Sequence, residues 1–369
     1  MSRGTELYGI VEEYAALGIH RTGTPVDWST AEWMADHLTR RGLDVAFDHY
    51  DFDQWTADST LTVDDRPVDH LAVPYEFTGR VTTSAPAIVS IDPMAGGFPE
   101  VLASPTAAAR AGGADAVVIA TEHPNGSLVA VNRVPGAGSG FPTVLIAGRD
   151  LATVTAADRI GLELEARTST GRTATVIATN GLAGPPLVVS TPLTGWFRCA
   201  GERATGIAVL IDLVSRVTDV PLMVVATTGH EIGQIGVERW VAAAAGSDPR
   251  GIVHLGASIG VEEHDGPSRR LATTRLAMTN LDSTVAGPVA EGLQPARLDL
   301  AADTESWIGE AQTFSTLAVP LLSLSGAGTD FHTPEDTPER ATSPESMAVA
   351  ADAVTNAVTQ FVRTLGATP

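Results

Sequence analysis

The sequence contains no lysine and only one cysteine. All 23 basic residues are arginines, against 44 aspartates and glutamates, so the formal net charge is −21. Nucleic acids and anionic membranes are bound through basic surfaces, and this charge therefore argues against both classes of partner. The single cysteine, Cys199, excludes an internal disulfide framework and fits a reducing compartment.

The sequence also lacks any run of about 18 uncharged apolar residues, the length that a membrane-spanning helix needs. Its first residues, MSRGTELYGIVEEY, do not show the charged and then apolar pattern of a secretory leader. We therefore expect a soluble cytoplasmic protein. The 369 residues, 44% of them hydrophobic, are enough for two domains of ordinary size. The oligomeric state is not predicted.

The hydrophobic pattern changes near residues 54 and 172. Between them, short β-rich runs and one alanine-rich helix alternate with glycine- and proline-containing loops. Outside them, the chain begins with two amphipathic helices, over 6–17 and from Ser29 onward. Apolar strands that alternate with helices follow after residue 172. This pattern predicts an α/β fold with a mostly parallel central sheet and helices on both faces. We predict a discontinuous domain formed by residues 1–53 and 173–369, with a small β-rich domain, residues 54–172, inserted into it.

Polar residues cluster in the loops that follow the predicted strands. In a parallel sheet these loops meet at the carboxyl ends of the strands, and here they carry Glu202, the pair His230-Glu231, and His332. A mononuclear zinc site needs about three nitrogen or oxygen ligands and an open position for water. The alternative is that Glu202 and Glu231 stabilise helix N-termini and that His332 forms hydrogen bonds within its loop. His230-Glu231 is not a complete zincin motif, because Gln234 stands where the second histidine is needed.

Two further residues are candidate nucleophiles. Ser258 lies in GASIG (256–260), which matches the G-x-S-x-G pattern of serine hydrolases, and Asp330 and His332 follow in the order such enzymes use. The next residues, VEEHDGPSRR (261–270), lack the helical pattern that this motif requires, and we favour small residues at a strand end. We interpret Cys199 as a buried, inert cysteine rather than a nucleophile.

Four segments of the chain resemble, in order, segments of the co-catalytic zinc aminopeptidase family. They are CAGERATGIAVLIDL (199–213), ATTGHEIGQIG (226–236), GEAQTFSTLAVPLLSLSG (309–326) and FHTPEDTPE (331–339). The family includes bacterial leucyl aminopeptidases, glutaminyl cyclase and glutamate carboxypeptidase II. The resemblance covers nearly the whole chain. The family also begins with two helices, and some members have a protease-associated insert, which residues 54–172 resemble.

The resemblance implies a partial set of metal ligands. Glu202 falls where the family has a bridging aspartate, Glu231 on a metal-binding glutamate, and His332 on the last histidine ligand. His230 falls on the glutamate that serves as general base. The family's His-x-Asp motif would fall at 191–193 and a later aspartate near Gly256, and both are absent. The missing ligands all belong to one metal of the pair, so the resemblance implies one divalent metal, zinc being the first expectation.

The function expected from this resemblance is single-metal hydrolysis of an amide or peptide bond in a small-molecule or short peptide substrate, with His230 as general base. Arg203 and Arg198 are candidate partners for a substrate carboxylate, because a guanidinium binds a carboxylate through two hydrogen bonds. His254 is expected near the rim of the site. Two alternatives remain open, acyl transfer in the manner of glutaminyl cyclase and a non-catalytic binding protein on a degenerate peptidase scaffold. A Glu202 carboxylate engaged by Arg203 would favour the binding protein.

Overall fold

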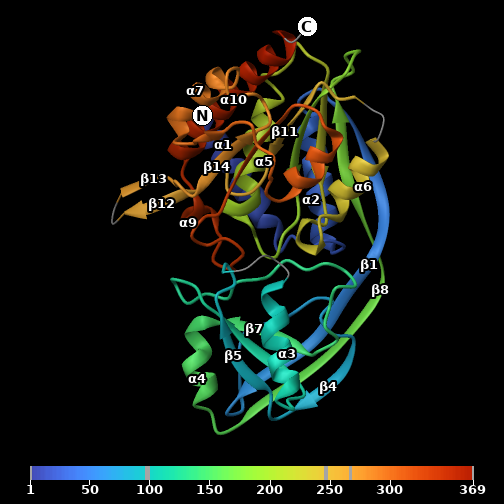
Figure 1. Cartoon of the computed structure of the whole chain (residues 1–369), viewed down its shortest axis with the longest axis vertical. Coiled ribbons are helices and arrows are strands. Elements are labelled where there is room, and N and C mark those ends of the chain that lie inside the picture. Colours follow the sequence, from blue (N-terminus) through green and yellow to red (C-terminus); the bar gives the residue numbers. More distant parts are fainter. Residues whose placement is uncertain (1, 96–99, 245–247, 266–267, 368–369) are drawn as a thin grey trace.

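Two parts of the chain are joined by a pair of long strands in the computed structural model, which describes residues 2–95, 100–244, 248–265 and 268–367 (Figure 1). The helices are α1 Arg3–Leu17, α2 Pro25–Thr39, α3 Ala103–Ala111, α4 Leu151–Thr155, α5 Thr205–Leu213, α6 Ile235–Ala244, α7 Gly287–Leu293, α8 Glu310–Phe314, α9 Pro338–Ala341 and α10 Pro344–Ala367. The strands are β1 Asp44–Val63, β2 Arg66–Pro67, β3 His70–Ala72, β4 Gly79–Thr83, β5 Ala87–Ile91, β6 Val117–Thr121, β7 Thr143–Ala147, β8 Ile160–Thr179, β9 Leu187–Pro192, β10 Leu222–Thr227, β11 Gly251–Leu255, β12 Glu262–Asp265, β13 Ser268–Leu271, β14 Arg275–Thr279, β15 Leu300–Ala301 and β16 Leu321–Gly326.

The large sheet is mixed, and only its centre is the parallel sheet that the sequence predicts. Its strands follow the order β15-β14-β16-β11-β9-β10-β8-β1-β2, with β4 paired to β8. The four central strands, β16, β11, β9 and β10, are parallel. The pairs β14–β16, β10–β8 and β8–β1 are antiparallel. The expectation of a mostly parallel sheet is therefore corrected to a parallel centre with antiparallel strands on both sides.

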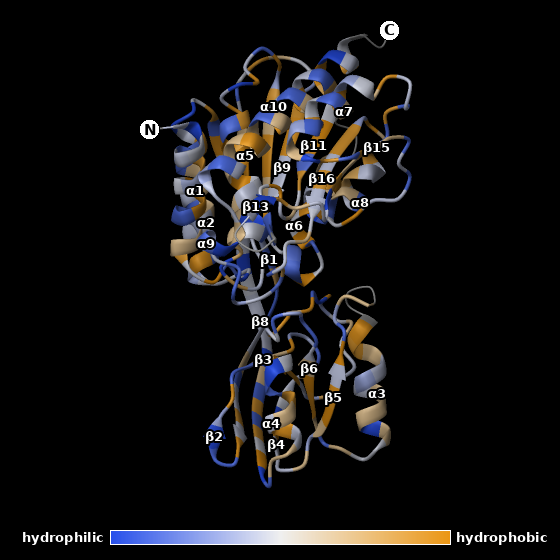
Figure 2. Cartoon of the chain, turned by 90° about the vertical axis from the view of Figure 1, so that its left-hand side faces the viewer, coloured by the Kyte–Doolittle hydropathy of each residue, from blue (hydrophilic) through white to orange (hydrophobic). Residues whose placement is uncertain are grey.

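Helices cover both faces of this sheet, because residues along the central strands alternate between two apolar clusters. Val189, Val224 and Val253 pack with helices α1, α2, α5, α7 and α10. Their neighbours in sequence, such as Val188 and Val225, pack with α6 and α8 on the other face. This alternation of buried residues on both faces is typical of a central strand of an α/β sheet. Figure 2 shows these hydrophobic strands inside the upper part of the molecule.

Strands β1 and β8 run through both predicted domain boundaries. They pair in one antiparallel register from Asp44↔Thr179 to Val63↔Ile160, so residues 54 and 172 lie within strands rather than in loops. The part beyond them contains the four-stranded sheet β3-β7-β6-β5. Its buried apolar residues, such as Trp55, Val118 and Ile146, form clusters of their own. The division into an inserted and a discontinuous domain stays a prediction, with its two boundaries inside continuous strands.

The ends of the helices follow from local capping. Helix α1 ends at Gly18, which has φ 125°, as the sequence predicts. Helix α2 begins earlier than the predicted Ser29, because Thr24 accepts a hydrogen bond from the Asp27 amide and Pro25 occupies the first helical position. Among the described residues, no helix, including the longest, α10, is both long enough and apolar enough to span a membrane.

Candidate active site

Of the polar residues predicted from the sequence, His230, His254 and His332 line a cavity of about 750 Å³ at the carboxyl ends of the parallel strands, whereas Glu202 lines a separate cavity of about 270 Å³. The larger cavity lies between the two parts of the molecule. Its described lining residues from the inserted part are Met94, Asn132, Arg133 and Val134, and those from the α/β part include His230, His254, Trp307, Ile308, Glu310 and His332. Its volume is that of a pocket for a small molecule.

His230 lies at the turn between β10 and α6. Gly229 before it has φ 80° and Gly233 after it has φ 90°. A side chain at Gly229 would lie 2.3 Å from Ile235, so this tight turn requires glycine. The turn directs His230 toward the cavity, which it lines. Burial and then the Arg203 charge lower the pKa of His230, although Glu310 acts in the opposite direction.

Glu310, which the sequence analysis did not identify, orients His230. Its Oε1 lies 3.1 Å from His230 Nδ1, and both of its oxygens lie within 3.0 Å of the Thr227 hydroxyl. Burial raises the pKa of Glu310. The hydrogen bond and the charge of His230 lower it, and their effect outweighs that of burial, so the pKa lies below its ordinary value. The carboxylate is therefore ionised and only accepts hydrogen bonds, so His230 Nδ1 donates and Nε2 keeps its lone pair. In the sequence, the one sign of this role is that Glu310 is an acidic residue at the start of a short apolar helix.

His254 and the other predicted substrate-binding residues lie in different surroundings. His254 on β11 lines the cavity and its Nδ1 is 2.8 Å from Ser190 Oγ. Burial lowers the pKa of His254 to about 4, so the ring is neutral at pH 7. Arg198 is exposed and does not line the cavity. Arg203 is fully buried and points at Glu202 rather than into the cavity.

The carboxylate of Glu202 lies beside the Arg203 guanidinium and the His332 imidazole. Glu202 lies in one turn of π-helix, Ala200–Ala204, that leads into α5. Its Oε1 is 2.7 Å from Arg203 Nη2 and 3.3 Å from His332 Nε2. Burial raises the pKa of Glu202, but the charges of Arg203 and His332 lower it well below the usual range. Glu202 therefore remains a carboxylate inside the protein.

Asp336 and Ala130 fix the positions of Glu202 and His332. The Asp336 carboxylate accepts hydrogen bonds from the backbone amides of Gly201 (2.7 Å) and Glu202 (2.9 Å). It thereby stabilises the start of the π-helical turn, a role that sequence spacing did not reveal. His332 Nδ1 is 3.0 Å from the Ala130 carbonyl oxygen of the inserted part, and the two residues also share a backbone hydrogen bond.

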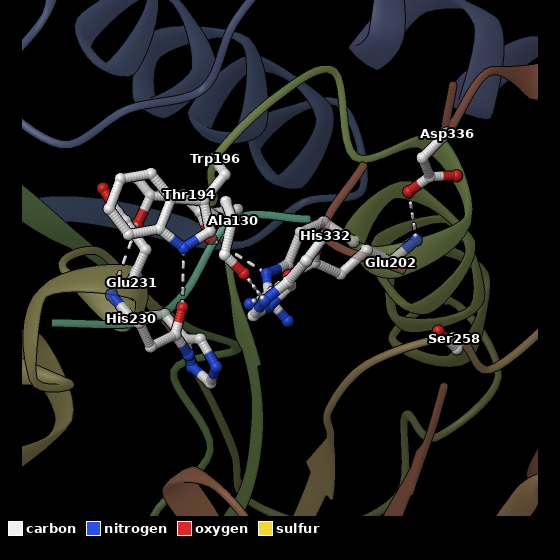
Figure 3. A network of polar contacts seen from close by, with 12 residues as sticks. Ala130, Thr194, Trp196, Glu202, His230, Glu231, Ser258, His332 and Asp336 are labelled. Carbon is white, nitrogen blue, oxygen red and sulfur yellow. Dashed lines mark hydrogen bonds and ion pairs between the residues drawn. The ribbon is translucent and has the colours of Figure 1, made fainter. Parts of the chain in front are cut away.

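Glu231 faces a different set of partners. One of its oxygens accepts a hydrogen bond from the Thr22 amide and the other from the Thr194 hydroxyl, both at 2.8 Å. In Figure 3, Glu202 and His332 point toward one another, whereas Glu231 lies beside Thr194. The structure thus brings Glu202 and His332 together and leaves Glu231 out of the set.

The residues described do not fit the predicted zinc ion in this arrangement. No group of three or more His, Cys, Asp or Glu side chains among them is placed to hold a metal. The physical reason is that Arg203 already neutralises Glu202 and that hydrogen bonds occupy both oxygens of Glu231. The ligand set of Glu202, Glu231 and His332 stays a sequence prediction, which these contacts do not support.

Neither of the other candidate nucleophiles is activated. Ser258 Oγ accepts a hydrogen bond from the Gly328 amide. Asp330 is held by two 2.8 Å hydrogen bonds from Arg340. These contacts do not link Ser258, a histidine and Asp330 into a catalytic triad. Strands β12 and β13, rather than a helix, follow Ser258. Cys199 is buried, and burial raises the pKa of its thiol, which keeps it protonated.

Comparison with known proteins places the fold. No protein-family model and no curated protein sequence matches the chain. Among solved structures, a peptidase M28 precursor from Shewanella amazonensis has a TM-score of 0.73 at 17% identity, covering 97% of this chain and 92% of its own. A zinc aminopeptidase from Bacillus subtilis has a TM-score of 0.74 at 17% identity, with coverage of 96% and 94%. An aminopeptidase from Aneurinibacillus has a TM-score of 0.63 at 19% identity, with coverage of 97% and 93%. At these identities the likeness shows the fold alone, and the chain has the fold of zinc aminopeptidases.

Proposed function

We propose that this protein is a hydrolase that cleaves an amide or peptide bond in a small substrate or short peptide, with His230 as general base. The observation that carries the proposal is the His230–Glu310 pair beside a cavity of about 750 Å³. A histidine held by a buried carboxylate is the arrangement that general-base catalysis uses. The peptidase-like fold supports the choice of an amide bond.

The proposed reaction follows from the protonation of this pair. Glu310 holds the proton on His230 Nδ1, so the lone pair on Nε2 is available to a water molecule. The water oxygen attacks the substrate carbonyl carbon while its proton passes to Nε2, which gives a tetrahedral intermediate. Nε2 then returns that proton to the leaving amine, the C–N bond breaks, and a carboxylic acid and an amine are released. The lowered pKa of His230 keeps the ring neutral, and so able to accept a proton, at pH 7.

His254 and the inserted part supply substrate contacts in this proposal. When the Ser190 hydroxyl donates to His254 Nδ1, the proton lies on Nε2, and the neutral ring becomes a donor for a substrate oxygen. Residues 54–172, proposed to act as a protease-associated domain, form one wall of the cavity through Asn132 and Val134. The predicted single zinc ion plays no part in these steps, because the described residues do not fit it.

A second candidate function is ligand binding without catalysis. The Glu202–Arg203 ion pair favours it, since that is the contact which, in the sequence analysis, points to a degenerate peptidase scaffold. The same cavity would then hold a small molecule or short peptide that leaves unchanged.

Turnover measurements with the purified protein separate these functions. We would use amino acid p-nitroanilides and dipeptides, comparing wild type with His230→Ala and with His49→Ala, an exposed histidine on β1, as the matched control. We expect His230→Ala to lower turnover by about 10²–10⁴-fold and His49→Ala to leave it unchanged. Full activity in His230→Ala would refute the assigned base. Binding of a panel member without any turnover would establish the binding function, and a cyclised product detected by mass would indicate acyl transfer.

A further inference from the structure

Arg203 is a buried arginine whose charge is balanced by one neighbouring residue. Its exposure is 0%, and it is among the largest fully buried side chains of the described chain. Its Nε donates to the Thr194 carbonyl oxygen at 2.9 Å and its Nη2 lies 2.7 Å from Glu202 Oε1. An arginine removed from water is tolerated only when an anion accompanies it, so Glu202 and Arg203 form a neutral buried pair.

The same oxygen of Glu202 also faces His332. A metal ion bound by both residues would lie about 2.0–2.2 Å from Glu202 Oε1 and from His332 Nε2. These two atoms are 3.3 Å apart, which suits two ligands of one ion. The Arg203 Nη2 at 2.7 Å from that oxygen would then lie beside a divalent cation in a site from which water is excluded. Two cations this close repel strongly in such surroundings, so the guanidinium and the ion exclude each other.

The third predicted ligand is also held by this network. Thr194 accepts from Arg203 through its carbonyl and donates to Glu231 through its hydroxyl. Arg203 thus bonds directly to Glu202 and, through Thr194, is linked to Glu231. The internal cation therefore neutralises the Glu202 carboxylate, whose Oε2 is buried without a hydrogen-bond partner among the described residues, while hydrogen bonds from Thr22 and Thr194 engage both oxygens of Glu231.

We propose that the Arg203 guanidinium permanently replaces a metal ion beside Glu202 and His332, so that the protein folds and functions without a bound metal. The inference does not rest on the proposed hydrolysis, because a binding protein would need the same charge balance. It assigns Arg203 a structural role, as the internal cation of the site, in place of the substrate contact predicted from the sequence.

The first test measures metal in the wild-type protein. The full chain is purified in the presence of Zn²⁺, dialysed, and analysed for metal content, and its Tm is measured with EDTA and with added Zn²⁺. We expect much less than one zinc per chain and no change in Tm. About one retained zinc per chain, with a Tm that falls when EDTA removes it, would overturn the proposal whether or not the protein proves to be a hydrolase.

The second test removes the charges in turn. Arg203→Met leaves the buried Glu202 carboxylate with only the His332 imidazole beside it and without its permanent cation, and we expect Tm to fall on the order of 10 °C. Adding Glu202→Gln to that variant removes the buried negative charge and should restore most of the loss. Arg216→Met is the matched control and should change Tm little, because Arg216 is exposed and its partner Asp212 also keeps an ion pair with Arg3. A double variant no more stable than Arg203→Met would contradict the proposed charge balance. If Arg203→Met does not fold, the metal analysis of the wild type decides the question.

Discussion

Replacing Glu310 by glutamine tests whether this residue positions and supports the proposed base. Glutamine has nearly the same volume, and its amide can still hydrogen-bond to both Thr227 and His230, so the substitution removes mainly the negative charge. During the proposed reaction His230 becomes an imidazolium, which the carboxylate at 3.1 Å stabilises. A hydrogen bond between charged groups contributes about 1.5–3 kcal/mol. Since about 1.4 kcal/mol corresponds to a factor of ten in rate, we expect kcat to fall roughly 10- to 150-fold.

The assay is steady-state kinetics on whichever substrate the wild type hydrolyses, together with Tm. Because Glu310 is fully buried and does not contact the substrate in this scheme, we expect KM to change little while kcat falls. The double variant with His230→Ala should be no slower than His230→Ala alone, since the two residues act as one unit. An unchanged kcat in Glu310→Gln would refute the positioning role. A loss that simply multiplies with that of His230→Ala would show that Glu310 acts through some other group.

Two further predictions concern residues away from this pair. Burial raises the pKa of Asp27 to about 7, against an unfolded value near 4, so its contribution to stability is fully present below about pH 4 and is lost as pH rises through 7. Asp27→Asn should therefore flatten the pH dependence of urea unfolding between about pH 4 and 7, and a profile identical to wild type would show that Asp27 is ionised in the folded protein. Ser258→Ala should leave turnover within a small factor, and a fluorophosphonate probe should not label the wild type; covalent labelling at Ser258 would instead indicate a serine hydrolase.

The sequence by itself determined the local structure and the edge of the sheet at which the site lies. Gly18 ends α1 as predicted. The continuous apolar strands predicted a sheet covered on both faces, and they form its parallel centre. Because the loops after such strands must meet, the sequence predicted that Glu202, Glu231 and His332 converge; in the structure Glu202 and His332 are in contact, whereas Glu231 has other partners. These features depend on periodicity and on residues close in sequence, which a single chain displays directly.

Only the tertiary structure decided which polar groups pair. Glu231 accepts hydrogen bonds from Thr22, 209 positions away, and from Thr194, and His230 pairs with Glu310, 80 positions away. Glu202 had an arginine as its neighbour in sequence, but nothing local showed that both side chains would turn inward and neutralise each other. The physical reason is that a buried charge takes whichever partner the packed chain brings within about 3 Å, and that distance is set by contacts remote in sequence.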